Sequence, residues 1–343
     1  MKKIRLLLFP LGWIYGTITY IRNLLFDLGI FKTFHIPGKS IVIGNLSVGG
    51  TGKTPHTAFL AGFLIEEGYK TAILSRGYGR KTKGFILASE TTGSSEIGDE
   101  PLTYYRNFPE AAVAVCEKRK EGIQRLQAIL HTDVFLLDDA FQHRAVTAEM
   151  NILLTDYSHP YFKDLMLPAG DLREWACGKK RADIVIVTKC PSLENETIKN
   201  RYRNSLGFPS ENIYFSSIVY GALKAFGPEE NPAVEKALLV TGIANPGPLE
   251  EYLSARFELT SLNYSDHYNF SEEDIEKIHK KFDTFASAKN GIIITTEKDF
   301  VRLMHPSLKQ KVLQRPWFYQ SISVKIDREE DLKNKIRNYV RAI

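Results

Sequence analysis

The residues best suited to chemistry in this chain form one segment, Ser47-Val48-Gly49-Gly50-Thr51-Gly52-Lys53-Thr54. It follows a short apolar run at residues 41–43 and precedes a helical pattern that starts near His56. Such a loop binds phosphate because backbone N–H groups and the helix N-terminus converge on the phosphate oxygens. Lys53 is expected to reach the β- and γ-phosphates, and the Thr54 hydroxyl to ligate Mg²⁺. Ser47 replaces the first glycine of the strict pattern, and the alternative is an ordinary glycine-rich turn.

Two pairs of acidic residues could serve the same site. Asp138 and Asp139 end an apolar run at residues 134–137, where phosphate-loop enzymes place an acid that holds Mg²⁺ directly or through water. Solvated acids at a strand end are the alternative. Asp99 and Glu100 stand at the start of a probable helix. Asp99 is either a helix cap or a general base that accepts the proton of an alcohol during phosphoryl transfer, and the spacing alone leaves both open.

Basic residues gather after several of the predicted strands, in the segments 75–81, 118–120 and 167–174. Guanidinium groups at one rim suit an anionic substrate, although such charges are commonly a solvated surface. Two polar residues also follow the acidic pair directly. The residues expected to bind the substrate are Arg76, Arg80, Arg119, Gln142, His143 and Arg173.

The second half of the chain contributes two further candidates. His267 follows a predicted strand and could orient Asp99 or change its proton affinity, although a lone histidine is usually structural. The segment Thr296-Glu297-Lys298-Asp299 is weakly similar to a motif that reads guanine.

Composition sets broad limits. The 343 residues carry a net charge of +5, and 43% of them are hydrophobic. This length favours two domains, and the mild basic bias suits an anionic ligand or a membrane surface better than nucleic acid. No protein partner is expected. The three scattered cysteines have no metal-ligand spacing and indicate a reducing compartment.

Apolar runs alternate with helical patterns from residue 40 onward, and this predicts an α/β fold: a doubly wound parallel sheet of the phosphate-loop NTPase type, with a second, smaller α/β domain. Ligands then lie at the carboxyl ends of the strands. Two extended segments, 213–220 and 317–326, could pair as a bridge between the domains, and a last helix at 329–341 could pack on the first. The predicted parts are an N-terminal helix at 1–34, a kinase domain at 35–222, a second domain at 223–316 and a closing segment at 317–343.

The N-terminus carries Lys2, Lys3 and Arg5 before an uncharged run at residues 6–21 that contains Trp13 and two tyrosines. The run is too short for an ordinary membrane span. Basic flanks with interfacial aromatics favour a helix that lies on or dips into a membrane. The alternative is a helix that packs on the protein core.

Taken together, these motifs resemble the tetraacyldisaccharide 4'-kinase family, the lipid A 4'-kinases of Gram-negative bacteria. The matching pieces are SVGGTGKTP at 47–55, SRGYGR at 75–80, GDEP at 98–101, DDAFQH at 138–143, PAGDLRE at 168–174 and TEKD at 296–299. The resemblance covers nearly the whole chain. It implies that ATP phosphorylates the 4'-hydroxyl of an anionic, tetraacylated disaccharide 1-phosphate, with Mg²⁺, at the cytoplasmic face of the inner membrane.

The same resemblance implies roles for particular residues. Asp99 would act as the base, aided by His267, while Asp138 and Asp139 would serve the metal and the phosphates. Arg119 and Arg173 match positions near the phosphates or the substrate. The expected metal ligands are Thr54, Glu100, Asp138 and Asp139.

Two other functions compete with a membrane-associated lipid kinase. One is a nucleotide-switch protein, a GTPase or ATPase that acts on a protein or metal partner. It would use the phosphate loop and the segment 296–299, but it gives no role to the apolar N-terminus. The other is a soluble sugar kinase.

Overall fold

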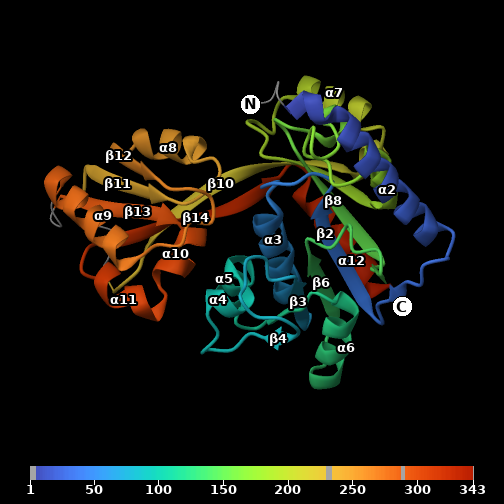
Figure 1. The fold of residues 1–343 in the computed structure, drawn as a ribbon, viewed down its shortest axis with the longest axis horizontal. Helices are drawn as coiled ribbons and strands as arrows, with labels where there is room; N and C mark the ends of the chain where they lie inside the picture. The colour runs from blue at the N-terminus through green and yellow to red at the C-terminus, as the bar shows by residue number, and fades with distance from the viewer. Residues whose placement is uncertain (1–4, 229–233, 287–289, 343) are drawn as a thin grey trace.

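The computed structural model describes residues 5–228, 234–286 and 290–342. Its centre is a twelve-stranded sheet in the order β12-β11-β13-β14-β10-β9-β8-β2-β6-β3-β5-β4. Figure 1 shows two lobes joined by the long strands β10 and β14. The first lobe comprises residues 5–212 and 327–342, and the second lobe comprises the described residues between 226 and 316.

The first lobe has the predicted parallel sheet with helices on both faces, except that β4 at its edge pairs antiparallel with β5. Its strands are β2 (Lys39–Asn45), β3 (Thr71–Ser75), β4 (Ile86–Leu87), β5 (Ala112–Val115), β6 (Val134–Asp138), β8 (Met150–Asp156) and β9 (Ile184–Thr188). A separate two-stranded sheet pairs β1 (Phe34–His35) with β7 (Val146–Thr147). The longer helices are α2 (Phe9–Asp27), α3 (Lys53–Glu66), α5 (Asp99–Asn107), α6 (Arg119–Ile129), α7 (Glu196–Leu206) and α12 (Glu329–Arg341). Shorter elements are α4 (Ser94–Ile97) and the 3₁₀ helices at Leu6–Leu8, Tyr161–Lys163, Ala176–Arg181 and Ser210–Asn212.

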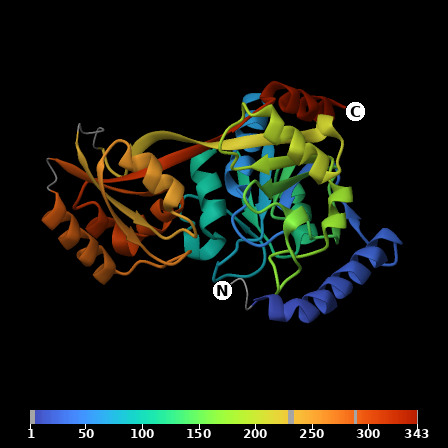
Figure 2. The ribbon, with the colours of Figure 1, turned by 90° about the horizontal axis from the view of Figure 1, so that it is seen from above.

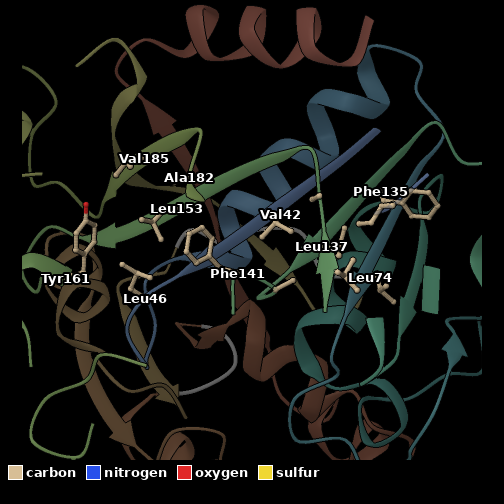
Figure 3. Packing of buried hydrophobic residues seen from close by; sticks show 14 of the residues in the cluster. Val42, Leu46, Leu74, Phe135, Leu137, Phe141, Leu153, Tyr161, Ala182 and Val185 are labelled. Atoms are coloured by element: carbon tan, nitrogen blue, oxygen red, sulfur yellow. The ribbon is translucent and has the colours of Figure 1, made fainter. Parts of the chain in front are cut away.

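The core of this lobe lies on both faces of its sheet. Successive residues of a strand point to opposite faces, so Val42 and Leu137 join one cluster while Ile41 and Leu136 join the other. Figure 3 shows the first cluster, with the aliphatic side chains of the central strands beside Phe141. The β2–β6 register sets Ile43 opposite Asp138, so the phosphate loop and the acidic pair leave the sheet at the same edge.

The second lobe continues the same sheet. Its strands are β11 (Lys236–Thr241), β12 (Glu258–Asn263) and β13 (Gly291–Thr296), and its helices are α8 (Gly247–Ser254), α9 (Glu272–Phe285), α10 (Glu297–Leu303) and α11 (Pro306–Val312). The predicted bridge forms between β10 (Ile213–Ala225) and β14 (Trp317–Ile326), which pair antiparallel. The residue bounds of the domains stay a prediction.

The N-terminal run is a 3₁₀ turn at Leu6–Leu8 followed directly by α2, although Pro10, Gly12 and Gly16 would be expected to interrupt a helix. Proline is tolerated in the first helical turn, and the two glycines are the buried residues of α2. A Cβ at Gly16 would come within 2.6 Å of the Trp175 ring, so glycine permits a close approach here. Among the described residues, none of the helices is both long and apolar enough to cross a bilayer. Figure 2 shows α2 along one edge of the first lobe, with α12 on the opposite side.

Candidate active site

The phosphate loop joins β2 to α3 as predicted, but the helix begins at Lys53, before the expected start near His56. Gly52 precedes it with a φ of 86°, a left-handed conformation that glycine adopts without strain. Both Lys53 and Thr54 therefore lie in the first turn, where backbone N–H groups lack partners within the helix.

Contacts from neighbouring segments fix the shape of this loop. The Thr188 hydroxyl at the end of β9 donates to the carbonyl of Thr51 at 2.8 Å, and Asn45 donates to the Thr51 hydroxyl at 2.8 Å. The Val48 N–H donates to the carbonyl of Asp171 at 2.7 Å, and Ser47 forms a β-bridge with Leu172. The loop is thus held in place by the sheet and by the segment that carries Arg173.

Lys53 and Arg173 meet at one carboxylate. The Lys53 Nζ lies 3.7 Å from Asp139 Oδ1, and Arg173 Nη1 donates to both oxygens of Asp139 at 3.0 and 3.2 Å. Asp139 has a φ of 47°, which is uncommon outside glycine and is typical of functional sites. The phosphate-loop lysine and the PAGDLRE segment therefore converge on the acidic pair.

Asp138 is the buried member of that pair, with 5% of its surface exposed. Burial raises the pKa of its carboxyl to about 6, and the neighbouring Asp139 adds to the effect, while Lys53 opposes it. Glu100 also raises this pKa, so the start of α5 lies close to the end of β6. The Thr57 hydroxyl donates to Asp138 at 3.3 Å.

Three of the predicted substrate-binding residues, Arg76, Arg119 and His143, interact electrostatically. Arg119 is buried and donates to the carbonyls of Cys116 and Asp138. Burial lowers the pKa of its guanidinium to about 10, although Asp138 raises it. His143 has a pKa lowered to about 4, by burial first and then by Arg119, Arg22 and Arg76. A positive region therefore borders the acidic pair, and Arg76 is exposed within it.

The structure gives structural partners to two other predicted substrate ligands. Arg80 pairs with Glu117 at 2.5 Å and has 3% of its side chain exposed. Gln142 donates to the carbonyl of Asn45 at 2.6 Å and to Glu174 at 3.0 Å. Both residues thus shape the loops beside the site.

Asp99 does not act as a helix cap. Gly98 occupies the cap position of α5, and Asp99 is the first helical residue. Its Oδ2 accepts from Arg302 Nε at 2.9 Å and from Nη2 at 2.5 Å, and it lies 3.5 Å from His267 Nδ1. Burial raises the pKa of Asp99, but the hydrogen bonds from His267 and Arg302 outweigh it and leave this pKa below its usual value.

The second lobe surrounds these acids with cations. Lys298 Nζ lies 3.0 Å from Glu100 Oε1 and 3.0 Å from His267 Nε2. His267 Nδ1 lies 3.0 Å from Arg302 Nη2 as well as 3.5 Å from Asp99 Oδ2, so both ring nitrogens of His267 face cationic side chains. His267 itself has a φ of 58°. The predicted pairing of Asp99 with His267 is therefore present, and it spans the two lobes.

The segment 296–299 has a structural explanation that excludes the guanine-reading role. Asp299 is fully buried and accepts from the Gly242 N–H at 2.9 Å, from Thr296 at 2.8 Å and from Arg302 at 3.0 Å. A carboxylate engaged in this way has no free edge for a base. Thr296 caps α10 by accepting from the Asp299 N–H at 3.1 Å.

Sequence reasoning missed three residues that organise the site. His56 joins the carbonyl of Gly52 to the Ser216 hydroxyl, at 2.7 and 2.8 Å. Glu174 is 3% exposed and accepts hydrogen bonds from three side chains. The third residue is Arg302, which binds Asp99. His56 lies one turn beyond Gly52 in α3, and Arg302 lies one turn beyond Lys298 in α10. The four-residue spacing, which brings side chains together on a helix, was the sequence signal for both residues.

The sheet order, the glycine-rich loop and the acids at the strand ends define a phosphate-loop nucleotide-binding protein. Its closer relationship is also clear: the chain belongs to the family of tetraacyldisaccharide-1-P 4'-kinases (LpxK), whose model matches residues 4–341.

Individual relatives agree with this membership. The tetraacyldisaccharide 4'-kinase of Flavobacterium psychrophilum is 43% identical, with 100% of this chain and 98% of the relative covered. That of Bacteroides thetaiotaomicron is 41% identical, with 99% and 94% covered. Among solved structures, LpxK from Aquifex aeolicus in complex with ATP is 29% identical, covers 98% of this chain and 99% of its own, and has a TM-score of 0.76. These findings support the kinase hypothesis over the nucleotide switch.

Proposed function

We propose that the protein transfers the γ-phosphoryl group of ATP to the 4'-hydroxyl of a tetraacylated disaccharide 1-phosphate. The observation that carries the proposal is the Asp99–His267 pair beside a phosphate loop. Phosphoryl transfer to an alcohol depends on positioning, on charge stabilisation and on a carboxylate that accepts the hydroxyl proton. Membership of the kinase family supports the same reaction.

In this mechanism the first turn of α3 and Lys53 hold the nucleotide. The backbone N–H groups at the start of α3 would bind the phosphates, and the Lys53 ammonium would stabilise the negative charge that develops on the γ-phosphate. Arg173 keeps Asp139 beside Lys53, through bonds of 3.0 and 3.2 Å. The exposed Arg76 would attract the anionic acceptor at the positive border of the site.

The donor chemistry fits Mg²⁺. No group of three or more His, Cys, Asp or Glu in the described residues could cage a metal ion, and Mg²⁺ bound to a nucleotide needs only one or two protein oxygens besides water and phosphates. Thr54 and Asp138 supply such oxygens. The pKa of Asp138 is raised first by burial and then by Asp139, and a bound cation would favour its ionised form. Asp139 pairs with Arg173, and Glu100 pairs with Lys298. We therefore propose that these two carboxylates lie around the bound metal and nucleotide. Bound Mg²⁺ would stabilise charge on the phosphates.

Asp99 then accepts the proton of the attacking hydroxyl. His267 lies 3.5 Å from Asp99 and, together with Arg302, holds the pKa of this carboxyl below its usual value, so that it stays ionised. Since the two residues come from different lobes, the base is assembled only where the lobes meet.

The outer face of α2 and of the 3₁₀ turn before it suits a lipid surface. Leu7, Ile14 and Ile18 are 80%, 59% and 61% exposed. Contiguous exposed apolar side chains of this kind mark an interaction surface. We infer that the protein works at the cytoplasmic face of the inner membrane, where a tetraacylated substrate resides.

The decisive test is a kinase assay with ATP and the disaccharide 1-phosphate lipid, followed by the mass of the product and the position of the new phosphate. We expect a gain of one phosphoryl group at the 4'-hydroxyl. GTP in place of ATP separates the nucleotide-switch alternative, because that class would hydrolyse GTP without the lipid. Absence of lipid phosphorylation in a folded, ATP-binding protein would reject the proposal.

A further inference from the structure

The segment 296–302 of the second lobe reaches the acids of the first lobe, and nothing in the proposed reaction yet accounts for it. Lys298 and Arg302 are four residues apart in α10 and therefore share one face of that helix. They contact Glu100 and Asp99, which are adjacent in the first turn of α5. Around these pairs, Val301 packs with Ile97, Leu102 and Val115.

Arg302 is held firmly on its own lobe. Its Nη1 donates to Asp299 Oδ1 at 3.0 Å, and Asp299 is fixed in turn by the Gly242 N–H and the Thr296 hydroxyl. Arg302 is 6% exposed. A guanidinium with a planar, pre-organised fork loses little freedom when it binds a carboxylate.

The other edge of that fork fixes Asp99. Nε and Nη2 both donate to Oδ2, at 2.9 and 2.5 Å, and Nη2 also lies 3.0 Å from His267 Nδ1. Among the described residues, no donor is bound to Oδ1. Rotation of the carboxylate would break two bonds to a cation that is itself immobile, so one oxygen is held and the other is left available.

We propose that Arg302 is a positioning residue for the kinase reaction: it fixes the Asp99 carboxylate so that Oδ1 alone is presented to the acceptor hydroxyl. The proposal rests on the proposed function, because it assumes that Asp99 is the base. It assigns the segment 296–302 to the assembly of that base, with Asp299 as the anchor of Arg302. A base displaced by about 1 Å loses on the order of a hundredfold in rate.

The test compares Arg302→Met with Arg302→Lys and Asn107→Ala. We expect Arg302→Met to lower kcat by about ten- to a hundredfold while the KM for ATP stays within about twofold of the wild-type value. Arg302→Lys should recover part of kcat, since it keeps the charge but not the fork. Asn107→Ala removes an inter-helix bond of 2.9 Å to Glu297 of α10 without touching Asp99, so it should leave kcat unchanged. An equal loss in the Asn107 variant would mean that loosening of the lobes explains the effect.

A double substitution separates positioning from a general structural effect. If Arg302 acts through Asp99, adding Arg302→Met to Asp99→Asn lowers kcat no further. A wild-type kcat for Arg302→Met, a raised one, or full additivity with Asp99→Asn overturns the proposal. If Asp99→Asn alone keeps wild-type kcat, the base assignment itself fails. Should Arg302→Met not fold, because Asp299 is left buried without its cation, the same comparison with Arg302→Lys decides the matter.

Discussion

Asn23 in α2 donates a hydrogen bond of 2.6 Å to Glu174, and this contact joins the exposed apolar helix to the loop that carries Arg173. Glu174 also accepts from Gln142 at 3.0 Å and from Arg181 at 2.7 Å. The Tyr15 hydroxyl donates to the carbonyl of Arg173 at 3.0 Å. The helix is therefore built into the site as well as facing outward.

We expect Asn23→Ala to destabilise the protein by about 1–3 kcal/mol, because a buried carboxylate loses a donor. The same change should lower kcat severalfold, since Arg173 follows the loop. Thermal unfolding and steady-state kinetics measure the two effects. Thr17→Ala is the matched control: its hydroxyl bonds only within α2, to the carbonyl of Trp13. A decrease of similar size in the control would show that α2 itself, and not the contact, is responsible.

Lys53→Ala should reduce phosphoryl transfer by about a hundredfold or more, because the ammonium stabilises charge only in the transition state. Its 3.7 Å contact with Asp139 is modest, so the fold should persist. Circular dichroism and a turnover assay test both points. Lys70→Ala, at an exposed position just before β3, should be fully active. Near-normal turnover of folded Lys53→Ala would exclude the loop as the phosphate site.

Replacing Leu7, Ile14 and Ile18 by glutamine should weaken binding to anionic vesicles about tenfold or more. The KM for lipid in vesicles should rise, while the affinity for ATP should not change. Vesicle sedimentation and kinetics give these values. Deletion of residues 1–22 is a poorer test, because it also removes Arg5 and Tyr15, which contact the loop at 168–173. Unchanged sedimentation would mean that the face does not meet a membrane.

Asp99→Ala should depress kcat by roughly a hundred- to ten-thousandfold, with ATP affinity nearly unchanged. His267→Ala should cost less, because His267 lies 3.5 Å from Asp99 and acts through it. The double variant should be little worse than Asp99→Ala, since groups in one relay are not additive. A double-mutant cycle in kcat provides the measurement. Fully additive losses would show that the two residues work independently.

Stability should fall on acidification because His56 is buried as a neutral ring. Burial lowers its pKa from 6.5 to about 4, although the Gly52 carbonyl opposes this. The unfolded chain therefore binds a proton below about pH 6.5 that the folded chain binds only near pH 4, and stability is lost across that interval. The cost approaches about 3 kcal/mol near pH 4. His56→Gln should flatten the profile of unfolding free energy against pH, whereas His131→Gln, at an exposed position, should not.

The sequence predicted most of the fold because the signals were local. Apolar runs of strand length, such as 134–137, were interrupted by helical patterns, and each corresponds to a strand of the sheet. The pairing of β10 with β14 was also expected. The start of α3 was misplaced, because the pattern of apolar residues begins at His56 whereas the backbone turns at Gly52.

Side-chain partners across the lobes were harder to predict. Asp99 and Arg302 are 203 positions apart in the sequence. The local periodicity of a sequence carries no information about contacts between residues so far apart. The segment around Asp299 is weakly similar to a guanine-binding motif, and its sequence does not reveal that Asp299 is buried and bound to the N–H of the distant Gly242. Glu174 was noticed only as part of a motif, since its donors come from three separate segments.

The return of the chain through β14 has a consequence for how the protein is made. Leu332 and Ile336 of α12 are fully buried in the same cluster as Ile41 and Ile43 of β2. A ribosome delivers β2 early and α12 only after the whole second lobe has emerged. Until then α3 packs on this face of the sheet through Leu60 and Leu64 without its neighbour, so the 13 residues of α12 complete the cover of the nucleotide-binding lobe only after the second lobe has been made.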